Sequence, residues 1–594
     1  MTLSFVPARL PRFACAALLV LLPAASSLRA DSEDGPPPGH VRKKGIDVDL
    51  RSLGRQVADD VAEHGTQVSA DVTSPLPGVD VVSQIQLRGQ NVQANDGALD
   101  NIQIFAGFRP FVKFTQSETS IAASGRNIVA AYNTSANQPL VQVNPTTLAF
   151  THRFLSGFSA SDDGGQTWTS GFLPPVSGSI FTFGDPVVAA DRHGNFYFAG
   201  LGANAAGQFT IQTNKSTDGG KSWSDAVVVQ QDNGGDKDWL AVGPDPFDRN
   251  RDNVYVTWTS FQATGSQVRF ARSTDGGATW TAKTVFAPLP DPNPANPQNA
   301  VQFSNPYVDP ITGRLYLPFA RFSNSDVDFI QVLASDDAGE TFHFLDFNAP
   351  GAPDPTLLPV VQPGELIDCR SGGRRLAIHS GADVGGRFGL RSFVQATRLT
   401  VQPTFAARNG VLYLAWSNST SPIFGDPNSG SNVMFVRSDD GGGTWSTPIP
   451  VNPSVAGDAH HVLPSLAIDQ DPNDVHVTYY TQHADGTVDL DMANSHDRGD
   501  SFPANRTVRV SSTSAPLTPS NIRLTANTST NYDRTIVACY CLGEYQGLGT
   551  ANGMVYTAWG DTRNMVTEPV NALDPLSGQT HAQTDVFFQK VKAQ

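Results

Sequence analysis

One short pattern occurs six times in this sequence, and the repetition limits the fold more than any other feature. The pattern is S-x-D-x-G-x-[ST]-[WF], and its copies begin at Ser161, Ser216, Ser273, Ser335, Ser438 and Ser495. In tight turns, Asp and Ser side chains bond nearby backbone groups and glycine takes a positive φ. The closing aromatic residue can bury a large apolar face. Each copy is therefore predicted to be a hairpin corner.

The spacing of the copies indicates a circular repeat. They recur at intervals of about 55 to 60 residues, which suits one four-stranded propeller blade per copy. At these residues the chain resembles the Asp-box (BNR-repeat) propellers, the group that includes the sialidases. The resemblance implies an all-β fold in which the boxes are structural and lie on the face away from the active site.

A second repeat gives the number of blades. Seven β-rich runs are expected to be second strands, at 128–132, 196–198, 254–258, 315–319, 412–416, 475–479 and 555–559. A short inner-strand candidate precedes each run, at 120–122, 187–189, 240–242, 307–308, 404–406, 465–467 and 546–548. We predict a seven-bladed β-propeller with four-stranded antiparallel blades. Six blades is the alternative, because the sialidase relatives have six. Residues 81–85 are the candidate for the strand that closes the last blade beside 585–588.

The ends of the chain differ from its middle. Residues 1–30 carry Arg9 and Arg12, an apolar run and a small-residue stretch, which is typical of a signal peptide, so we predict a secreted or periplasmic protein. Residues 31–80 form an N-terminal extension, partly helical or flexible. The propeller is expected over 81–594, with an insertion at about 348–400 that lacks both repeats.

Charge and cysteine content restrict the partners. The formal net charge of -16 argues against a nucleic-acid or anionic-membrane surface. No apolar run is long enough for a membrane span. We expect a monomer whose partner is a glycan or glycoprotein. Outside the leader, Cys369 has two possible disulfide partners, Cys539 and Cys541, and free buried thiols are the alternative.

Polar residues lead into the predicted inner strands. They are Glu118, Asp185, Lys237 with Asp238, Asn305, Gln402, His460 with His461, and Glu544 with Tyr545. Carboxylates and amides that converge near the axis suit sugar hydroxyls or a cation. The alternative interpretation is that they cap strand ends and satisfy backbone groups.

The resemblance also implies a catalytic set. Glu544-Tyr545, followed by Gln546, Gly547 and Leu548, looks like the family stretch that supplies a tyrosine nucleophile activated by a glutamate. On this reading Tyr545, Glu544 and Asp185 are catalytic. Glu118, Asp238, Asn305 and Arg563 bind substrate. The positions that correspond to the family's first arginine hold Ser117, Gly184, Asp236, Ser304, Val401 and Val462 instead.

Two function classes follow. One is an exo-acting glycoside hydrolase of the sialidase-like group, and the other is a non-catalytic binding propeller for a protein or polysaccharide. No metal-ligand motif is present and no cofactor is predicted. Calcium is the alternative at Asp245, Asp248, Asn250 and Asp252, and at Asp469, Asp471 and Asn473, although such residues also make turns.

Overall fold

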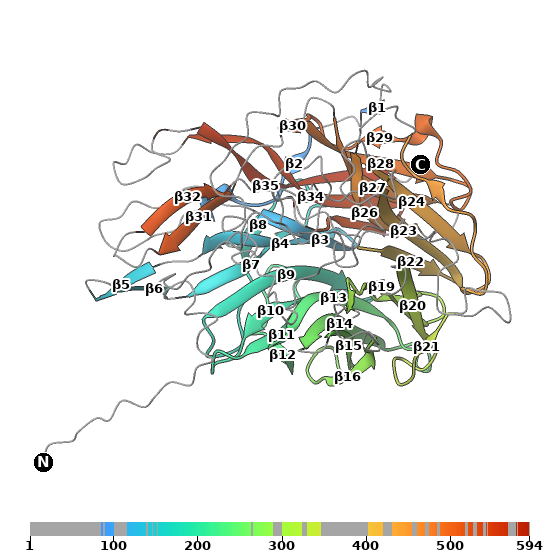
Figure 1. Ribbon diagram of the computed structural model, residues 1–594, viewed down its shortest axis with the longest axis horizontal. Helices are drawn as coiled ribbons and strands as arrows, with labels where there is room; N and C mark the ends of the chain where they lie inside the picture. The colour runs from blue at the N-terminus through green and yellow to red at the C-terminus, as the bar shows by residue number, and fades with distance from the viewer. Residues whose placement is uncertain are drawn as a thin grey trace, which may run out of the picture.

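A computed structural model describes residues 85–86, 90–99, 116–345 and 402–592, with short gaps inside the two long ranges. Its regular structure is almost entirely β (Figure 1). The helices in the described part are two 3-10 turns, η3 (Gly97–Leu99) and η4 (Ala504–Arg506). Among the described residues, no helix has the length and apolar character needed to cross a bilayer. Several predicted features lie outside these residues. They are the leader, the N-terminal extension, the three later cysteines, and the insertion with its basic residues Arg370, Arg374 and Arg375.

The first half of the described chain forms three antiparallel units of four strands. The first unit is β3 (Gln116–Ser124), β4 (Asn127–Asn137), β7 (Arg153–Ser161) and β8 (Thr169–Phe172); the second is β9 (Phe181–Ala190), β10 (Phe196–Ala203), β11 (Phe209–Ser216) and β12 (Val227–Gln231); the third is β13 (Gly235–Pro244), β14 (Asp252–Gln262), β15 (Gly265–Ser273) and β16 (Thr281–Phe286). A separate hairpin, β5 (Leu140–Asn144) and β6 (Thr147–Phe150), extends from the first unit.

The second half repeats the arrangement. The fourth unit is β17 (Ala300–Gln302), β18 (Tyr307–Val308), β19 (Leu315–Phe322), β20 (Phe329–Ser335) and β21 (His343–Phe344); the fifth is β22 (Thr404–Arg408), β23 (Val411–Ser419), β24 (Ser431–Ser438) and β25 (Ile449–Pro450); the sixth is β26 (His460–Ile468), β27 (Val475–Gln482), β28 (Thr487–Ser495), β29 (Val508–Arg509) and β30 (Ala515–Pro516); the seventh is β33 (Gly547–Ala551), β34 (Met554–Thr567) and β35 (Thr580–Lys592). Strands β31 (Asn521–Ala526) and β32 (Tyr532–Val537) pair only with each other among the described strands.

These units fall where the sequence repeats predicted them. Every predicted second-strand run lies within β4, β10, β14, β19, β23, β27 or β34. The inner-strand candidates likewise coincide with β3, β9, β13, β18, β22, β26 and β33, apart from Gln546, which precedes β33. The prediction works because strands covered on both faces carry short, nearly continuous runs of apolar and β-branched residues, as in β10 and β14, which are buried along almost their whole length.

The closing strand was predicted in the wrong place. Strand β2 (Val92–Gln93) pairs antiparallel with Phe587 and Phe588 of β35, and so completes the seventh unit. The predicted segment 81–85 reaches only β1 (Ile85–Gln86), which pairs in parallel with β29 of the sixth unit. The two short apolar segments have similar composition. Backbone pairing to β35, further stabilised by a hydrogen bond from Ala94 N to Val586 O of 2.8 Å, selects the later one.

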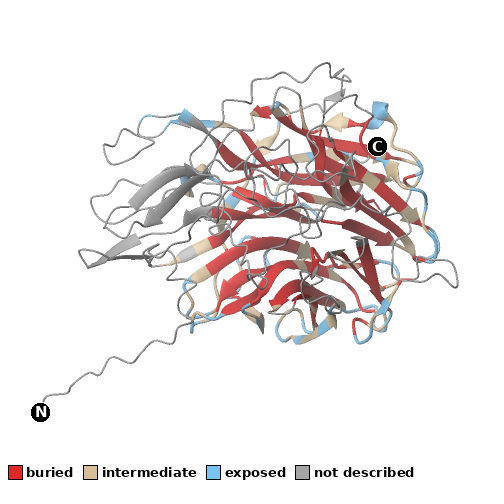
Figure 2. Cartoon of the chain, viewed as in Figure 1, coloured by how far each residue is buried: buried red, intermediate tan, exposed pale blue. Residues whose placement is uncertain are grey.

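The inner strands contact one another in a closed circuit. β3 contacts β9, β9 contacts β13, and the series continues through β18, β22 and β26 to β33, which returns to β3. At the closing contact Gly547 lies so near β3 that a Cβ there would sit 2.9 Å from Ile121 N. Most residues of the strands are buried (Figure 2), and apolar clusters join neighbouring units, as where Phe158 and Val188 share one cluster. This arrangement of radial antiparallel sheets describes a β-propeller.

The repeated octapeptide is a self-contained turn. In the first copy Ser161 Oγ donates to Asp163 Oδ1 at 2.8 Å and accepts from Gly165 N at 2.8 Å. The same carboxylate accepts from Thr167 N at 3.0 Å and from the Thr167 hydroxyl at 2.7 Å. These bonds, that of the Thr167 hydroxyl first, hold the pKa of Asp163 below its usual value. The Ser–Asp and Ser–Gly bonds recur in the other five copies.

The closing aromatic of the turn joins neighbouring units. Trp223 packs edge-on against Phe158 of the unit before it, with ring centroids 5.8 Å apart, and Phe502 does the same against Phe435 at 5.1 Å. Trp168 of the first unit packs against Phe588 of the seventh at 5.0 Å. The same contact that links consecutive units therefore also links the first unit to the last.

Candidate functional site at the hub of the inner strands

The inner strands share a bulge near their starting ends, and the hub is built from the residues in it. Glu118, Asp185 and Lys237 have φ values of 52°, 54° and 51°, and the ladder register shifts beside Glu118 and Lys237. Phe303 and Leu463 occupy the same left-handed region in the fourth and sixth units. A left-handed conformation of a residue other than glycine costs of order 1 kcal/mol or more and persists only where surrounding contacts hold it.

A chain of hydrogen bonds holds the first three bulges together. Asn133 Nδ2 donates to Glu118 Oε2 at 2.8 Å, and its amide oxygen accepts from Asp185 N at 3.1 Å. Asp185 Oδ2 in turn accepts from Lys237 N at 2.9 Å. The side chain of each unit thus satisfies the bulged backbone of the next, which fixes the relative positions of the charged groups.

Tyr545 reaches this cluster from the far end of the chain. Its hydroxyl donates to the carbonyl of Pro186, the residue after Asp185, at 3.2 Å. Its ring packs edge-on against Trp239, with centroids 4.9 Å apart. The Lys237 ammonium lies over both rings, 3.4 Å from the Tyr545 centroid and 4.8 Å from that of Trp239. The fold therefore brings two of the predicted catalytic residues, Asp185 and Tyr545, side by side.

The cluster is buried and rich in carboxyl groups. Glu118, Asp185, Asp236, Asp238 and Glu544 are each at most 2 % exposed. Burial, followed by the charges of Glu118 and Asp236, raises the pKa of Asp185 well above 3.8. Burial also raises the pKa of Asp238, against the opposing charge of Lys237. These two groups therefore hold protons at a pH where an exposed aspartate has lost them.

The Lys237 and Asp238 side chains at the hub have no hydrogen-bond partner among the described residues. Buried polar groups are nearly always bonded, so such groups often mark a ligand or a functional role. Burial, and then the charges of Glu118 and Asp185, raise the pKa of the Tyr545 hydroxyl well above 10. It is therefore a neutral hydrogen-bond donor in this structure.

Other residues predicted for the site bond partners outside this cluster. Asn305 is buried and donates to Pro403 O at 3.3 Å, so it links the fourth and fifth units. The Arg563 guanidinium donates to Asp561. It also donates to Asn91 at 3.0 Å and to Ser512 at 2.8 Å. The guanidinium of Arg563 also lies 4.2 Å from the Phe587 ring centroid. His460 and His461 are buried, which lowers the pKa of each to about 3. These contacts join neighbouring strands and do not include the side chains of the hub cluster.

Two of the carboxylates predicted as alternative calcium ligands, Asp245 and Asp252, bond other protein groups. Asp245 accepts from Asn253 Nδ2 at 2.7 Å and from two backbone amides, and it pairs with Arg251. Asp252 pairs with Arg192 at 2.6 Å. Within the described residues, no group of three or more His, Cys, Asp or Glu side chains is arranged to hold a metal ion. Asp471 and Asn473 lie outside the described residues.

Three of the positions compared with the family's first arginine are buried or closely packed. Ser117 and Asp236 are fully buried, and a Cβ on Gly184 would lie 2.5 Å from Asn133 Oδ1. Asn133 takes the space because its amide bridges Glu118 and Asp185. Sequence reasoning missed Asn133 and Trp239. Asn133 lies on the second strand of the first unit, at its hub end, and Trp239 lies beside the bulge at Lys237. Neither position differs in sequence from that of an ordinary strand residue.

Comparisons with known proteins place this geometry in context. No family model and no curated protein matches the chain. Among solved structures it is similar to a protein of unknown function from Dyadobacter fermentans DSM 18053, with 13% identity, a TM-score of 0.37, and coverage of 70% of this chain and 96% of that one. It is also similar to the Trypanosoma rangeli sialidase, with 12% identity, a TM-score of 0.36, and coverage of 85% of this chain and 59% of that one. The α-L-arabinofuranosidase of Fusarium graminearum is similar at 13% identity, with a TM-score of 0.28 and coverage of 60% of this chain and 92% of that one. Such distant matches carry no argument about activity.

The class that these observations support is a β-propeller. The support comes from the repeated turn and from the closed circuit of inner strands.

Proposed function

We propose that this protein is a seven-bladed propeller that recognises a glycan at its hub and hydrolyses a terminal glycosidic bond. The seven units are its blades, because their inner strands form one closed circuit and β2 completes the last unit. The single observation that carries the catalytic proposal is the meeting of Tyr545 with the Asp185–Pro186 segment, 359 residues away in the sequence, at 3.2 Å.

The chemistry assigns a role to each partner. Asp185 keeps its proton because its pKa is raised, so it can donate that proton to the leaving-group oxygen. Tyr545 supplies the nucleophilic oxygen once its proton passes to a base, for which the adjacent Glu544 is the candidate. Lys237, over the Tyr545 ring at 3.4 Å, places positive charge where a phenolate would form. Because the cluster is buried, a substrate reaches it only when neighbouring side chains move aside.

The charge of the hub favours a neutral sugar. Two of the five buried carboxyl groups, Asp185 and Asp238, hold protons, and the other three still outnumber the one ammonium group, so this excess of acid opposes an anionic substrate. The family's arginine positions, which would hold a sialic-acid carboxylate, are occupied by Ser117, Gly184 and Asp236. We therefore propose a neutral terminal residue, such as a pentose or hexose, as the substrate class.

Turnover of aryl glycosides tests the proposal. The panel contains neutral pentosides and hexosides and one sialoside, assayed with wild type, Tyr545→Phe, Asp185→Asn and Tyr132→Phe. Tyr132 is the matched control, because its buried hydroxyl also donates to a backbone carbonyl at 3.2 Å, that of Phe158. Loss of the nucleophile should lower kcat by about 10³-fold or more, whereas Tyr132→Phe should keep kcat within about threefold. Equal turnover by wild type and Tyr545→Phe would exclude Tyr545 as the nucleophile.

A binding propeller is the second candidate, and the burial of the cluster favours it. It requires saturable binding of an oligosaccharide with no turnover of any glycoside in the panel. We also propose that the chain is exported, on the basis of the leader-like residues 1–30. N-terminal sequencing of the protein from culture medium or periplasm tests export, and an intact N-terminus on protein confined to the cytoplasm would contradict it.

A further inference from the structure

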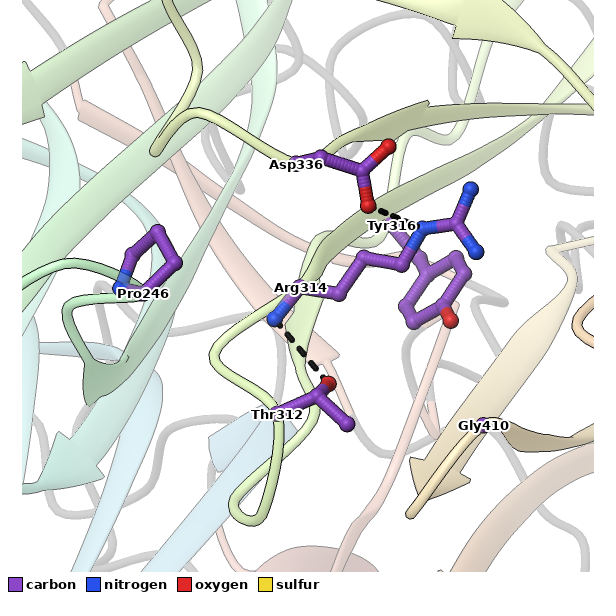
Figure 3. A pocket seen from close by; sticks show the side chains of 6 residues that line it. All are labelled: Pro246, Thr312, Arg314, Tyr316, Asp336 and Gly410. Carbon is purple, nitrogen blue, oxygen red and sulfur yellow. Dashed lines mark hydrogen bonds and ion pairs between the residues drawn. The ribbon is translucent and has the colours of Figure 1, made fainter.

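A polar cavity lies away from the hub cluster (Figure 3). It has a volume of about 270 Å³ and is lined by Pro246, Thr312, Arg314, Tyr316, Asp336 and Gly410. Asp336 belongs to the repeated turn that begins at Ser335, so the cavity opens on the face that carries these turns. The eight residue-to-residue steps from Lys237 to Asp245, which precedes the lining residue Pro246, span about 25 Å of extended chain. The cavity is therefore separate from the hub.

One wall of the cavity is an ordered polar array. Arg314 Nε lies 3.0 Å from Asp336 Oδ1, and Arg314 Nη2 lies 3.1 Å from His343 Nε2. Figure 3 shows the Arg314 side chain between Asp336 and Tyr316, and its guanidinium is 5.4 Å from the Tyr316 ring centroid. Tyr316 is fully buried, and its hydroxyl finds no acceptor among the described residues. The wall thus offers a carboxylate and a guanidinium, and the buried Tyr316 hydroxyl becomes available as a donor when the side chains that cover it move.

The rim beside this wall is apolar and exposed. Phe247, next to Pro246, is 77 % exposed, and Ile311, next to Thr312, is 44 % exposed. The side chain of Arg249 donates to the Ile311 carbonyl, which ties the two loops together. A Cβ on Gly313 would lie 3.0 Å from Pro246 Cα, so the loops are closely packed. A single exposed apolar side chain is ordinary, but two on joined loops at the mouth of a polar cavity indicate a binding surface.

The charges around the cavity select the ligand class. Arg314 is paired with Asp336, and the nearby Arg251 is paired with Asp245 at 2.5 Å. These pairs give little net charge with which to hold a phosphate or a carboxylate ligand. A neutral sugar suits both halves of the site. Its hydroxyls match paired donors and acceptors, and its C–H face can cover an aromatic ring.

We propose that this cavity binds one residue of a neutral glycan, with the adjoining sugar stacked on Phe247. Gly410 marks the open side, because a Cβ built there meets no atom within 4 Å. The inference does not depend on the hub being catalytic. Two separate sites on one chain would raise the local concentration of polysaccharide at the hub without any new contact there.

Oligosaccharide binding measured by isothermal titration calorimetry tests the proposal. The probes are neutral xylo-, cello-, arabino- and galacto-oligosaccharides at up to about 10 mM, with sialyllactose as the anionic comparator. We compare wild type with Phe247→Ala, Arg314→Gln and Tyr316→Phe. Ile180→Ala is the matched control, since Ile180 is also an exposed apolar residue, at 42 %, and it does not line the cavity.

We expect at least one neutral oligosaccharide to bind. Phe247→Ala should weaken binding about fivefold to tenfold, the loss of one aromatic stacking contact. Tyr316→Phe, which removes only a hydroxyl, should weaken it about threefold to tenfold, and Ile180→Ala should leave it unchanged. Three results would each overturn the proposal: no binding of any neutral probe, tighter binding of sialyllactose than of the neutral sugars, or equal binding by wild type and Phe247→Ala.

Discussion

Replacement of Asp238 by Asn tests the electrostatic description of the hub. Burial raises the folded-state pKa of Asp238 above its unfolded value of 3.8, so the folded protein holds this proton more tightly than the unfolded chain does. The stability that this proton contributes is fully present below pH 3.8. It is lost as the pH rises from 3.8 to the folded-state pKa. Within that window the loss amounts to about 1.4 kcal/mol per pH unit.

The amide in the Asp238→Asn variant resembles the protonated acid in shape and carries no titratable proton. The free energy of unfolding of this variant should therefore rise relative to wild type by about 1.4 kcal/mol for each pH unit between 4 and the folded-state pKa of Asp238. Some pH dependence should remain, because the pKa of Asp185 is also raised. Urea unfolding at half-unit intervals from pH 4 to 7 measures both slopes.

Asp275→Asn is the matched control: burial is the largest single influence and raises the pKa of Asp275, but the hydrogen bonds of its turn together outweigh burial and lower that pKa to about 2. The stability that ionised Asp275 contributes is present above pH 3.8 and is lost as the pH falls toward 2. Its replacement should therefore not alter the change in unfolding free energy with pH between pH 4 and 7. Identical slopes for wild type and Asp238→Asn across that range would show that Asp238 ionises normally, and the description of the hub would be wrong.

Two further predictions concern the repeated turns. Asp218→Ala removes the acceptor of the Ser216 hydroxyl and of the Ser222 amide and hydroxyl. Urea unfolding should show a free energy of unfolding lower by about 1 to 3 kcal/mol. The control Asp225→Ala, at an exposed position, should change it little. Gly220→Ala places a Cβ 2.1 Å from Val129 Cγ2, at a φ of +89°. Gly207 has a similar φ of +74°, but a Cβ there meets no atom within 4 Å. Gly220→Ala should therefore lower the melting temperature more than Gly207→Ala. Equal losses for the two glycines would show that the turn is not packed against the neighbouring unit.

The strand order was predictable because each unit carries its own local signals. A Ser, an Asp and a glycine at fixed spacing bond one another within eight residues, so the turn that begins at Ser161 needs no distant partner. Alternation along 254–258 and its equivalents is likewise a local property.

The closing strand and the Asn133 bridge at the hub were harder to predict, because both depend on contacts between distant segments. Val92–Gln93 was missed because two weak apolar segments competed for β35, and the sequence does not show which one pairs. The hub residues Glu118, Asp185 and Tyr545 were found from their position before an inner strand or from the family resemblance. The bridge through Asn133 depends on how closely two units approach, which no local pattern encodes.

A co-crystal structure with the neutral oligosaccharide that binds best tests the proposed role of the hub most directly. We expect sugar density within about 3 Å of the Asp185 carboxyl and the Tyr545 hydroxyl, with the bond to Pro186 O broken. Density confined to the cavity beside Phe247 and Arg314, with the hub unchanged from its sugar-free form, would contradict glycan recognition at the hub.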